Sequence, residues 1–320
     1  MRIILFMALI AAALPRTLCA NDIYRFIPRH SQQVVQINLS DITGLETVKQ
    51  DLIRNVNRQT GLDQKDDKML NFGSFIDKII AVTPDLTVDE TCIFVQFKIS
   101  EAEFCRKLEE LAGVKLILVP GTRPAERRFV LQGNQLFPGI VLEKRTFALA
   151  FLTGNVAVIA KNDLSFYRKF KELGLDERKR KELTVPHALA AGYTEISAQL
   201  LAENPFLPRI LRAVYSLAAG KDESLYIRVS ATCADEELAN QTLMQVQQYV
   251  MIGGIVLNQL DPELMQEWMT SVKVNRDKTA VNLNAYFSKR FITRLAEGSE
   301  KMTGSLNPAD SAVFPDGGKR

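Results

Sequence analysis

Apolar residues recur with two different periods along the chain, and the change of period marks where strands and helices begin. In residues 92–99 every second side chain is large and apolar, which predicts a strand with one buried face. A helix is predicted directly after it, because Ser100 is a favourable N-cap and Glu101 and Glu103 fall in the first turn. Gly113 predicts the end of that helix.

The same order of elements recurs in the second half of the chain. Residues 224–233 alternate between apolar and polar side chains, and a helix with acidic residues in its first turn follows. Residues 91–111 align with residues 224–244 without gaps. The pattern predicts an α+β fold of two duplicated halves, each a mixed or mostly antiparallel sheet with helices packed on one face.

Further periods complete the predicted order of elements. Strands are predicted at residues 34–39, 79–82, 116–119, 128–131, 140–143, 147–152, 156–160, 187–196, 272–274 and 280–286. Helices are predicted at residues 45–58, 163–173, 261–270 and 289–296. Another helix is predicted at residues 204–218, because Pro205 suits a first helical position and apolar residues follow at helical spacing up to Gly220.

Composition divides the chain into five predicted parts. Residues 1–20 are predicted to be a signal peptide, residues 21–173 a first α+β domain and residues 187–297 a second one. Residues 174–186 are dense in charges of both signs, which predicts a linker between these domains. Residues 298–320 are polar, contain glycine and proline and lack a period, which predicts a disordered tail.

The first residues have the three parts of a secretory leader. Arg2 supplies a positive start, residues 3–14 are apolar and uncharged, and Ala20 is a small residue suitable for cleavage. The apolar run is shorter than the roughly 20 residues that a membrane-spanning helix needs. We therefore expect an exported chain that begins at Asn21 and works in the periplasm or outside the cell. Attachment of a lipid to Cys19 is the alternative.

Net charge weakens one class of partner. Of the 40 basic residues, Arg2 and Arg16 leave with the leader, and the 38 that remain nearly balance the 37 acidic residues. Proteins that bind nucleic acid usually carry a basic excess, because the phosphate backbone dominates their affinity. We therefore expect no nucleic-acid partner.

Candidate catalytic chemistry is sparse in this sequence. The two histidines, His30 and His187, are far apart in the chain, and no G-x-S-x-G segment is present to offer a nucleophilic serine. No H-E-x-x-H or paired C-x-x-C segment predicts a metal site. We assign no catalytic, cofactor-binding or metal-binding residue. A hydrolase that uses paired carboxylates is the alternative, because 37 acidic residues offer many pairs.

The cysteines test the predicted packing. Cys92 lies on the face of its strand opposite to Ile93, whereas Cys105 lies on the helix that should cover the Ile93 face. A disulfide needs two Cα atoms within about 7 Å and converging side chains. We therefore predict that Cys92, Cys105 and Cys233 are free thiols.

An uncharged apolar segment at residues 249–257 is the candidate interaction surface. Its candidate residues are Met251, Ile252, Ile255 and Val256. Two interpretations remain open: a central helix buried between a sheet and its neighbours, or a surface that a partner or lipid covers. Trp268 is predicted to belong to the core rather than to a ligand platform.

Two short stretches carry a resemblance to a group of known proteins. FIPRHSQQVVQINLSDI and TGNVAVIAKNDLSFYRKF resemble segments of exported bacterial proteins of unknown function that are built from repeated α+β units. The resemblance implies the fold only and transfers no catalytic residue. The expected function is an exported, non-enzymatic binding or assembly protein of the bacterial cell envelope, without cofactor or transmembrane anchor, whose partner is an envelope protein or a small apolar ligand.

Overall fold

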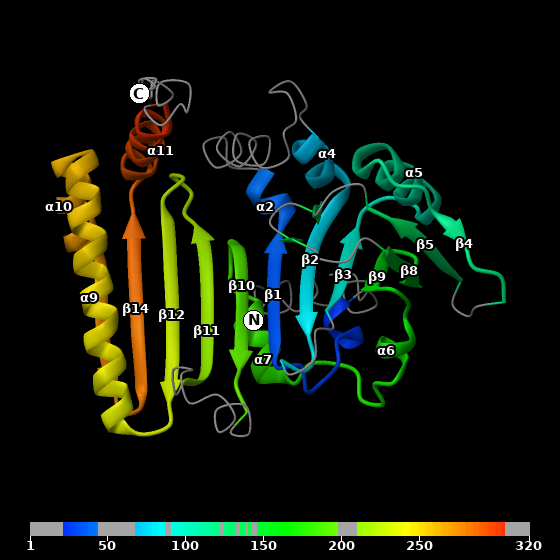
Figure 1. Cartoon of the computed structure of the whole chain (residues 1–320), viewed down its shortest axis with the longest axis horizontal. Coiled ribbons are helices and arrows are strands. Elements are labelled where there is room, and N and C mark those ends of the chain that lie inside the picture. Colours follow the sequence, from blue (N-terminus) through cyan, green and yellow to red (C-terminus); the bar gives the residue numbers. More distant parts are fainter. Residues whose placement is uncertain are drawn as a thin grey trace, which may run out of the picture. The chain divides into compact units, whose positions relative to one another are not determined.

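The computed structural model describes residues 22–43, 68–86, 91–121, 125–131, 135–137, 140–141, 146–197 and 210–304. The chain forms two compact units, of which the first ends at Ser216 and the second begins at Leu217. Both units combine helices with antiparallel strands (Figure 1), so the predicted α+β class is confirmed. The signal peptide and the helix at residues 45–58 lie outside the described residues.

The first unit is built on one antiparallel sheet. Its strands are β1 (Gln33–Asn38), β2 (Ile76–Thr83), β3 (Cys92–Phe97), β4 (Ile117–Leu118), β5 (Glu126–Val130), β8 (Thr146–Thr153), β9 (Val156–Lys161) and β10 (Ala188–Glu195). They are hydrogen-bonded in the order β10-β1-β2-β3-β9-β8-β5-β4. Two short strands, β6 (Gln135–Phe137) and β7 (Ile140–Val141), pair separately. The strands predicted at residues 147–152 and 156–160 are confirmed as β8 and β9, which pair with each other in a hairpin.

Short helices accompany these strands. They are η2 (Ile23–Phe26), α2 (Leu39–Thr43), α4 (Lys68–Phe75), α5 (Glu101–Ala112), α6 (Ser165–Arg168) and α7 (Glu177–Leu183). The predicted ends of α5 are confirmed: the Ser100 side chain accepts a hydrogen bond from the Glu103 backbone N–H, and Gly113 adopts a left-handed φ of 63°. Of the helix predicted at residues 163–173, only the four residues of α6 are helical.

Both faces of the central strand β3 are buried. Ile93, Val95 and Phe97 pack in one cluster with Phe104 of α5, and the Phe97 and Phe104 rings stack at 4.5 Å. Cys92 and Phe94 pack on the opposite face with Ile27. The sequence predicted burial of one face only; the amino-terminal segment around η2 covers the other.

The three described cysteines form no disulfide, as predicted. Cys92 belongs to the core cluster on one face of the sheet and Cys105 packs against the cluster on the other face. The sheet itself therefore separates the two sulfur atoms.

The helix predicted at residues 204–218 is wrong. The segment instead overlaps strand β11 (Ile210–Ala219). The boundary between the two units falls within this strand, after Ser216. The Ile196 backbone N–H donates to the Leu211 carbonyl at 2.9 Å. The spacing of apolar residues predicts which side chains are buried, but it does not show which backbone groups pair. Hydrogen bonds to another segment can therefore form a strand where the apolar spacing favours a helix.

The charged segment at residues 174–186 is not a linker at the boundary between the units. It contains α7, which Asp176 caps by accepting from the Lys179 backbone N–H at 2.8 Å. Lys179 and Leu183 of this helix are buried. The boundary instead falls after Ser216. The segment belongs to the first unit, and its charged side chains pair with other groups of that unit, as described below.

The second unit is a small antiparallel sheet covered by helices on one face. Strands β12 (Leu225–Cys233), β13 (Val272–Asp277) and β14 (Ala280–Phe287) are ordered β13-β14-β12. Helices α9 (Glu236–Leu260), α10 (Pro262–Ser271) and α11 (Lys289–Gly304) complete the unit. Figure 1 shows α9 lying along the strands. Helix α11 continues into the first residues of the predicted disordered tail, and residues 305–320 lie outside the described residues.

The single tryptophan, Trp268, is partly buried and packs against the core of the second unit, in agreement with its predicted place in the core. The Trp268 ring stacks on Phe287 at 5.5 Å, and its Nε1 donates to the Val250 carbonyl at 2.7 Å. Leu257, Leu264 and Phe291 surround this contact. No helix in the described part of the chain is both long and apolar enough to span a membrane.

Candidate functional site

Helix α9 carries the candidate surface and begins with a strong local signal. The Asp235 side chain caps it by accepting from the Leu238 backbone N–H at 2.8 Å, and Glu236 and Glu237 occupy the first turn. After Glu237, the next charged residue in the chain is Asp261. The body of a helix of 25 residues is therefore uncharged all round.

One side of α9 is buried against its own unit. Ala239, Gly254 and Leu257 are the buried residues of the helix. A Cβ atom at Gly253 would lie 3.0 Å from the Trp268 ring, so this glycine allows α9 and α10 to approach closely. The adjacent Gly254 likewise lies against Met269 of α10, so both glycines serve packing inside the unit.

The opposite side of α9 is exposed in the structure. The four residues predicted from the sequence are all exposed: Met251 by 58%, Ile252 by 55%, Ile255 by 57% and Val256 by 47%. We define the α9 outer face as these residues with their exposed neighbours on the helix, Met244, Gln248 and Tyr249. Of the two interpretations, the central helix buried on all sides does not describe α9 in the second unit.

Replacing Met251 by aspartate tests this exposure. We expect Met251→Asp to change the free energy of unfolding by less than about 1 kcal/mol, because an exposed side chain contributes little to stability. The matched change Leu257→Asp, at a position only 8% exposed, should destabilise by more than about 3 kcal/mol, because it buries a carboxylate. Urea unfolding followed by circular dichroism measures both. Equal losses would mean that α9 is buried on both sides.

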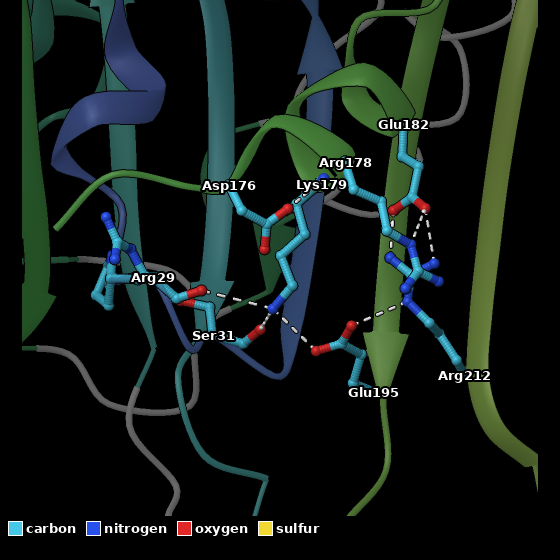
Figure 2. A network of polar contacts seen from close by, with 9 residues as sticks. Arg29, Ser31, Asp176, Arg178, Lys179, Glu182, Glu195 and Arg212 are labelled. Atoms are coloured by element: carbon cyan, nitrogen blue, oxygen red, sulfur yellow. Dashed lines mark hydrogen bonds and ion pairs between the residues drawn. The ribbon is translucent and has the colours of Figure 1, made fainter. Parts of the chain in front are cut away.

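A second feature, in the first unit, is a buried ion-pair cluster that the sequence did not predict. We use this name for Lys179 and Glu182 of α7, Glu195 of β10 and Arg212 of β11 (Figure 2), of which Lys179 is buried and the other three are half-buried. Lys179 Nζ lies 2.9 Å from a Glu195 carboxylate oxygen, and Arg212 Nε donates to the other oxygen at 2.9 Å. Arg212 also pairs through two nitrogens with the Glu182 carboxylate, in the bidentate manner that arginine favours.

The donors of Lys179 are all engaged. Besides Glu195, its Nζ donates to the backbone carbonyls of Arg29 at 3.5 Å and Ser31 at 3.4 Å. An ammonium group has three protons and no free acceptor, so it has no spare donor for a substrate in this arrangement. The cluster therefore fastens α7 to the amino-terminal segment and to β10.

Electrostatics within the cluster favour its charged state. Burial raises the pKa of the Glu195 carboxyl, but hydrogen bonds from Lys179 and Arg212 outweigh burial and hold this pKa below its ordinary value. Burial likewise lowers the pKa of Arg212, and the hydrogen bonds to Glu182 and Glu195 reverse that effect and raise it. The ring of Tyr193 lies beneath both cations, 5.1 Å from Lys179 Nζ and 5.6 Å from the Arg212 guanidinium carbon.

The lowered pKa of Glu195 predicts a pH dependence of stability. Compared with Glu195→Gln, the wild-type chain should gain stability above the ordinary glutamate pKa of about 4.3. The gain should disappear as the pH falls from that value through the lower folded pKa, because protonation then removes the charge that Lys179 and Arg212 stabilise. Urea unfolding of both proteins at several pH values measures the difference. A difference that is constant down to strongly acidic pH would contradict the assignment.

The Tyr193 hydroxyl is fully buried and has no hydrogen-bond partner in the structure. Burial is the main cause that raises the pKa of this phenol, with a contribution from Glu195, so the hydroxyl stays neutral. An unsatisfied buried hydroxyl costs about 1–3 kcal/mol. Its ring, in contrast, contributes to the core and to the contacts with both cations.

Removing this hydroxyl should not destabilise the protein. We expect Tyr193→Phe to leave the free energy of unfolding unchanged or to raise it by up to about 1 kcal/mol. The control is Tyr24→Phe, which should lose about 1 kcal/mol, because the Tyr24 hydroxyl donates to Gln36 at 2.6 Å and accepts from Lys78 at 3.1 Å. Chemical unfolding measures the free energy of unfolding of both variants. If Tyr193→Phe loses as much stability as the control, the Tyr193 hydroxyl has a hydrogen-bond partner.

Two described cavities bear on the hydrolase alternative. One of about 600 Å³, between the end of α5 and β5, contains Glu109, whose carboxylate accepts from the Leu116 backbone N–H at 2.9 Å. Another of about 440 Å³, between α10 and α11, contains Glu263 and Glu267. Arg290 and Arg294 pair with Glu263, and the Ser288 backbone N–H donates to Glu267 at 3.0 Å. The carboxylates in these two cavities are thus held by protein donors.

The remaining candidate groups do not form a site in the described residues. His30 is exposed and lies 3.3 Å from Glu172, and His187 is exposed at the start of β10. Within the described ranges, no group of three histidine, cysteine or acidic residues is placed to hold a metal ion. Comparison with known proteins finds no matching family model, no matching curated protein and no matching solved structure.

Proposed function

We propose that this chain is an exported, non-enzymatic binding or assembly protein of the bacterial cell envelope, and that it contacts its partner through the α9 outer face. The observation that carries the proposal is the exposure of large apolar side chains on a helix that has no charged residue between Leu238 and Leu260. Contiguous apolar surface of this kind is typical of interaction sites in soluble proteins.

The energetics of the exposed residues support this proposal. Full burial of one aliphatic side chain of this size is worth about 1.5–3 kcal/mol. Ile252 and Ile255 are more than half exposed, although the opposite side of the same helix packs against α10 and the strands. A partner that covers the α9 outer face therefore buries apolar side chains that remain exposed in the second unit by itself.

Site-specific photo-cross-linking in intact cells tests the proposal. A photoreactive amino acid in place of Ile252 should give cross-linked products, because a partner covers this position. The control position is Ile117 on β4, which is 61% exposed and lies in the first unit. The absence of products at position 252, with normal export, would overturn binding through α9.

Export is a separate part of the proposal and has its own measurement. Cleavage after Ala20 gives a soluble chain that begins at Asn21, whereas attachment of a lipid gives a modified Cys19. Intact mass spectrometry of the protein from its native cells distinguishes the two products by mass. A chain that retains Met1 would contradict export by a cleaved leader.

We also propose that the two units arose by duplication. In support, β3 leads to α5 and β12 leads to α9, and both helices have a capping side chain and two acids in the first turn. The units differ in size, and α9 has 25 residues where α5 has 12. Superposition of experimental structures of the two units tests this; a β3–α5 pair that does not superpose on β12–α9 would reject it.

A further inference from the structure

We propose that the partner of the α9 outer face is a second copy of this chain, with the two α9 helices antiparallel across a two-fold axis. This inference rests on the proposed binding function and names its partner. A two-fold interface places the same surface of both copies in contact, so the surface must be complementary to itself. Three properties of α9 meet this requirement.

The first property is the absence of charge. No residue from Leu238 to Leu260 is charged, so two copies can approach along the whole face without repulsion between like charges. A partner with a charged surface would lose hydration on binding here and gain no ion pair from α9 in return.

The second property is the chemistry of the polar positions. The exposed polar residues from position 240 to position 259 of the helix are all primary amides: Asn240, Gln241, Gln245, Gln247, Gln248, Asn258 and Gln259. A primary amide offers both a donor and an acceptor, so a glutamine can pair with another glutamine. They are interspersed with Met244, Ile252 and Ile255, which pack equally well against themselves.

The third property fixes the direction of pairing. The start of α9 is acidic, with Glu236 and Glu237, whereas the cations near its other end are already paired: Arg290 with Glu263, and Arg294 with Asp261 and Glu263. Antiparallel helices keep the acidic starts of the two copies apart, and they also align the helix dipoles favourably. Parallel helices would place acidic ends together.

Other occupants fit the face less well. A helix that lies on a lipid surface usually has lysine or arginine on its polar side, and α9 has neither. A small apolar ligand is normally enclosed by a concave pocket. Neither of the two described cavities is lined by α9.

The geometry predicts a modest affinity. A helix of 25 residues is about 38 Å long, and a strip about 10 Å wide along it covers roughly 400 Å². Stable interfaces bury about 800 Å² on each partner. The exposed Met269 of α10, which lies against Gly254, adjoins α9, but the pair should still dissociate on dilution.

Sedimentation velocity of the mature chain over a range of micromolar concentrations tests the inference. We expect a reversible shift from monomer to dimer as the concentration rises. Ile252→Asp with Ile255→Asp should raise the dissociation constant at least about 100-fold while leaving the melting curve unchanged, because both side chains are exposed in the monomer. Ile117→Asp, a matched change of an exposed isoleucine elsewhere, should dimerise like the wild type.

A charge-pair experiment tests the symmetry. Gln248→Glu and Gln248→Lys should each weaken self-association, because two-fold pairing brings like charges near one another at the middle of α9. An equimolar mixture of the two variants should dimerise at least as well as the wild type. Failure of the mixture to recover overturns two-fold pairing.

The two proposals can fail separately. A wild-type chain that is monomeric at every concentration overturns the second copy as partner. If position 252 then still cross-links to a different molecule in cells, the proposed binding function stands. If the chain is monomeric and position 252 gives no product, both proposals fail.

Discussion

Replacing Gly192 with alanine is expected to lower the free energy of unfolding by about 3 kcal/mol. Gly192 lies in β10, opposite Val35 of β1. A Cβ atom at this position would lie 2.6 Å from the Val34 carbonyl oxygen and would overlap the Tyr215 ring. The ring can move, but the carbonyl belongs to the backbone of β1 and can move only if the pairing with β10 is distorted.

Urea unfolding of Gly192→Ala measures this effect. Gly154→Ala is the control, because the structure places nothing within 4 Å of a Cβ atom there, and it should be neutral. A Gly192→Ala variant as stable as the control would show that β1 and β10 do not pair in the described register.

Replacing Lys179 with methionine should also lower the free energy of unfolding by about 3 kcal/mol. Methionine keeps an unbranched apolar chain over Tyr193, so the loss reports mainly on the charge. The variant leaves the carbonyls of Arg29 and Ser31 without this donor and removes one of the two cations that pair with Glu195. Because Lys179 is buried, water cannot replace the ammonium group freely.

The same substitution elsewhere on α7 provides the control. The Lys181 side chain is 76% exposed and pairs with Glu177 one turn earlier. Lys181→Met should therefore change the free energy of unfolding by no more than about 0.5 kcal/mol. Chemical unfolding of both variants at neutral pH compares them. Equal stabilities would mean that the buried ion-pair cluster does not hold α7 in place.

The candidate surface was only half predictable from the sequence. The period and lack of charge in residues 249–257 single out Met251, Ile252, Ile255 and Val256, but a helix that is apolar all round is also what a buried central helix requires. The structure decides between these, because α10 and the strands cover only one side of α9. A sequence pattern reports which residues are apolar and not how many neighbours surround them.

The buried ion-pair cluster was missed for a related reason. Charged residues of both signs at 174–186 predict a solvated segment, and most such segments are solvated. Lys179, however, meets Ser31 across 148 positions of the chain, and its other partners come from β10 and the amino-terminal segment. One signal was available: Asp176 followed by Lys179 and Leu183 fits a capped helix with a buried side.

What the sequence by itself determined about this protein lies within short stretches of chain. The two ends of α5, the acidic first turn of α9 and the β8–β9 hairpin follow from side chains a few positions apart. Only the tertiary structure decided that β11 is a strand, that Lys179 is buried and that the α9 outer face is exposed. These outcomes depend on contacts between distant segments, and the hydrogen bonds and buried surface of such contacts outweigh local preferences worth a few tenths of a kcal/mol per residue.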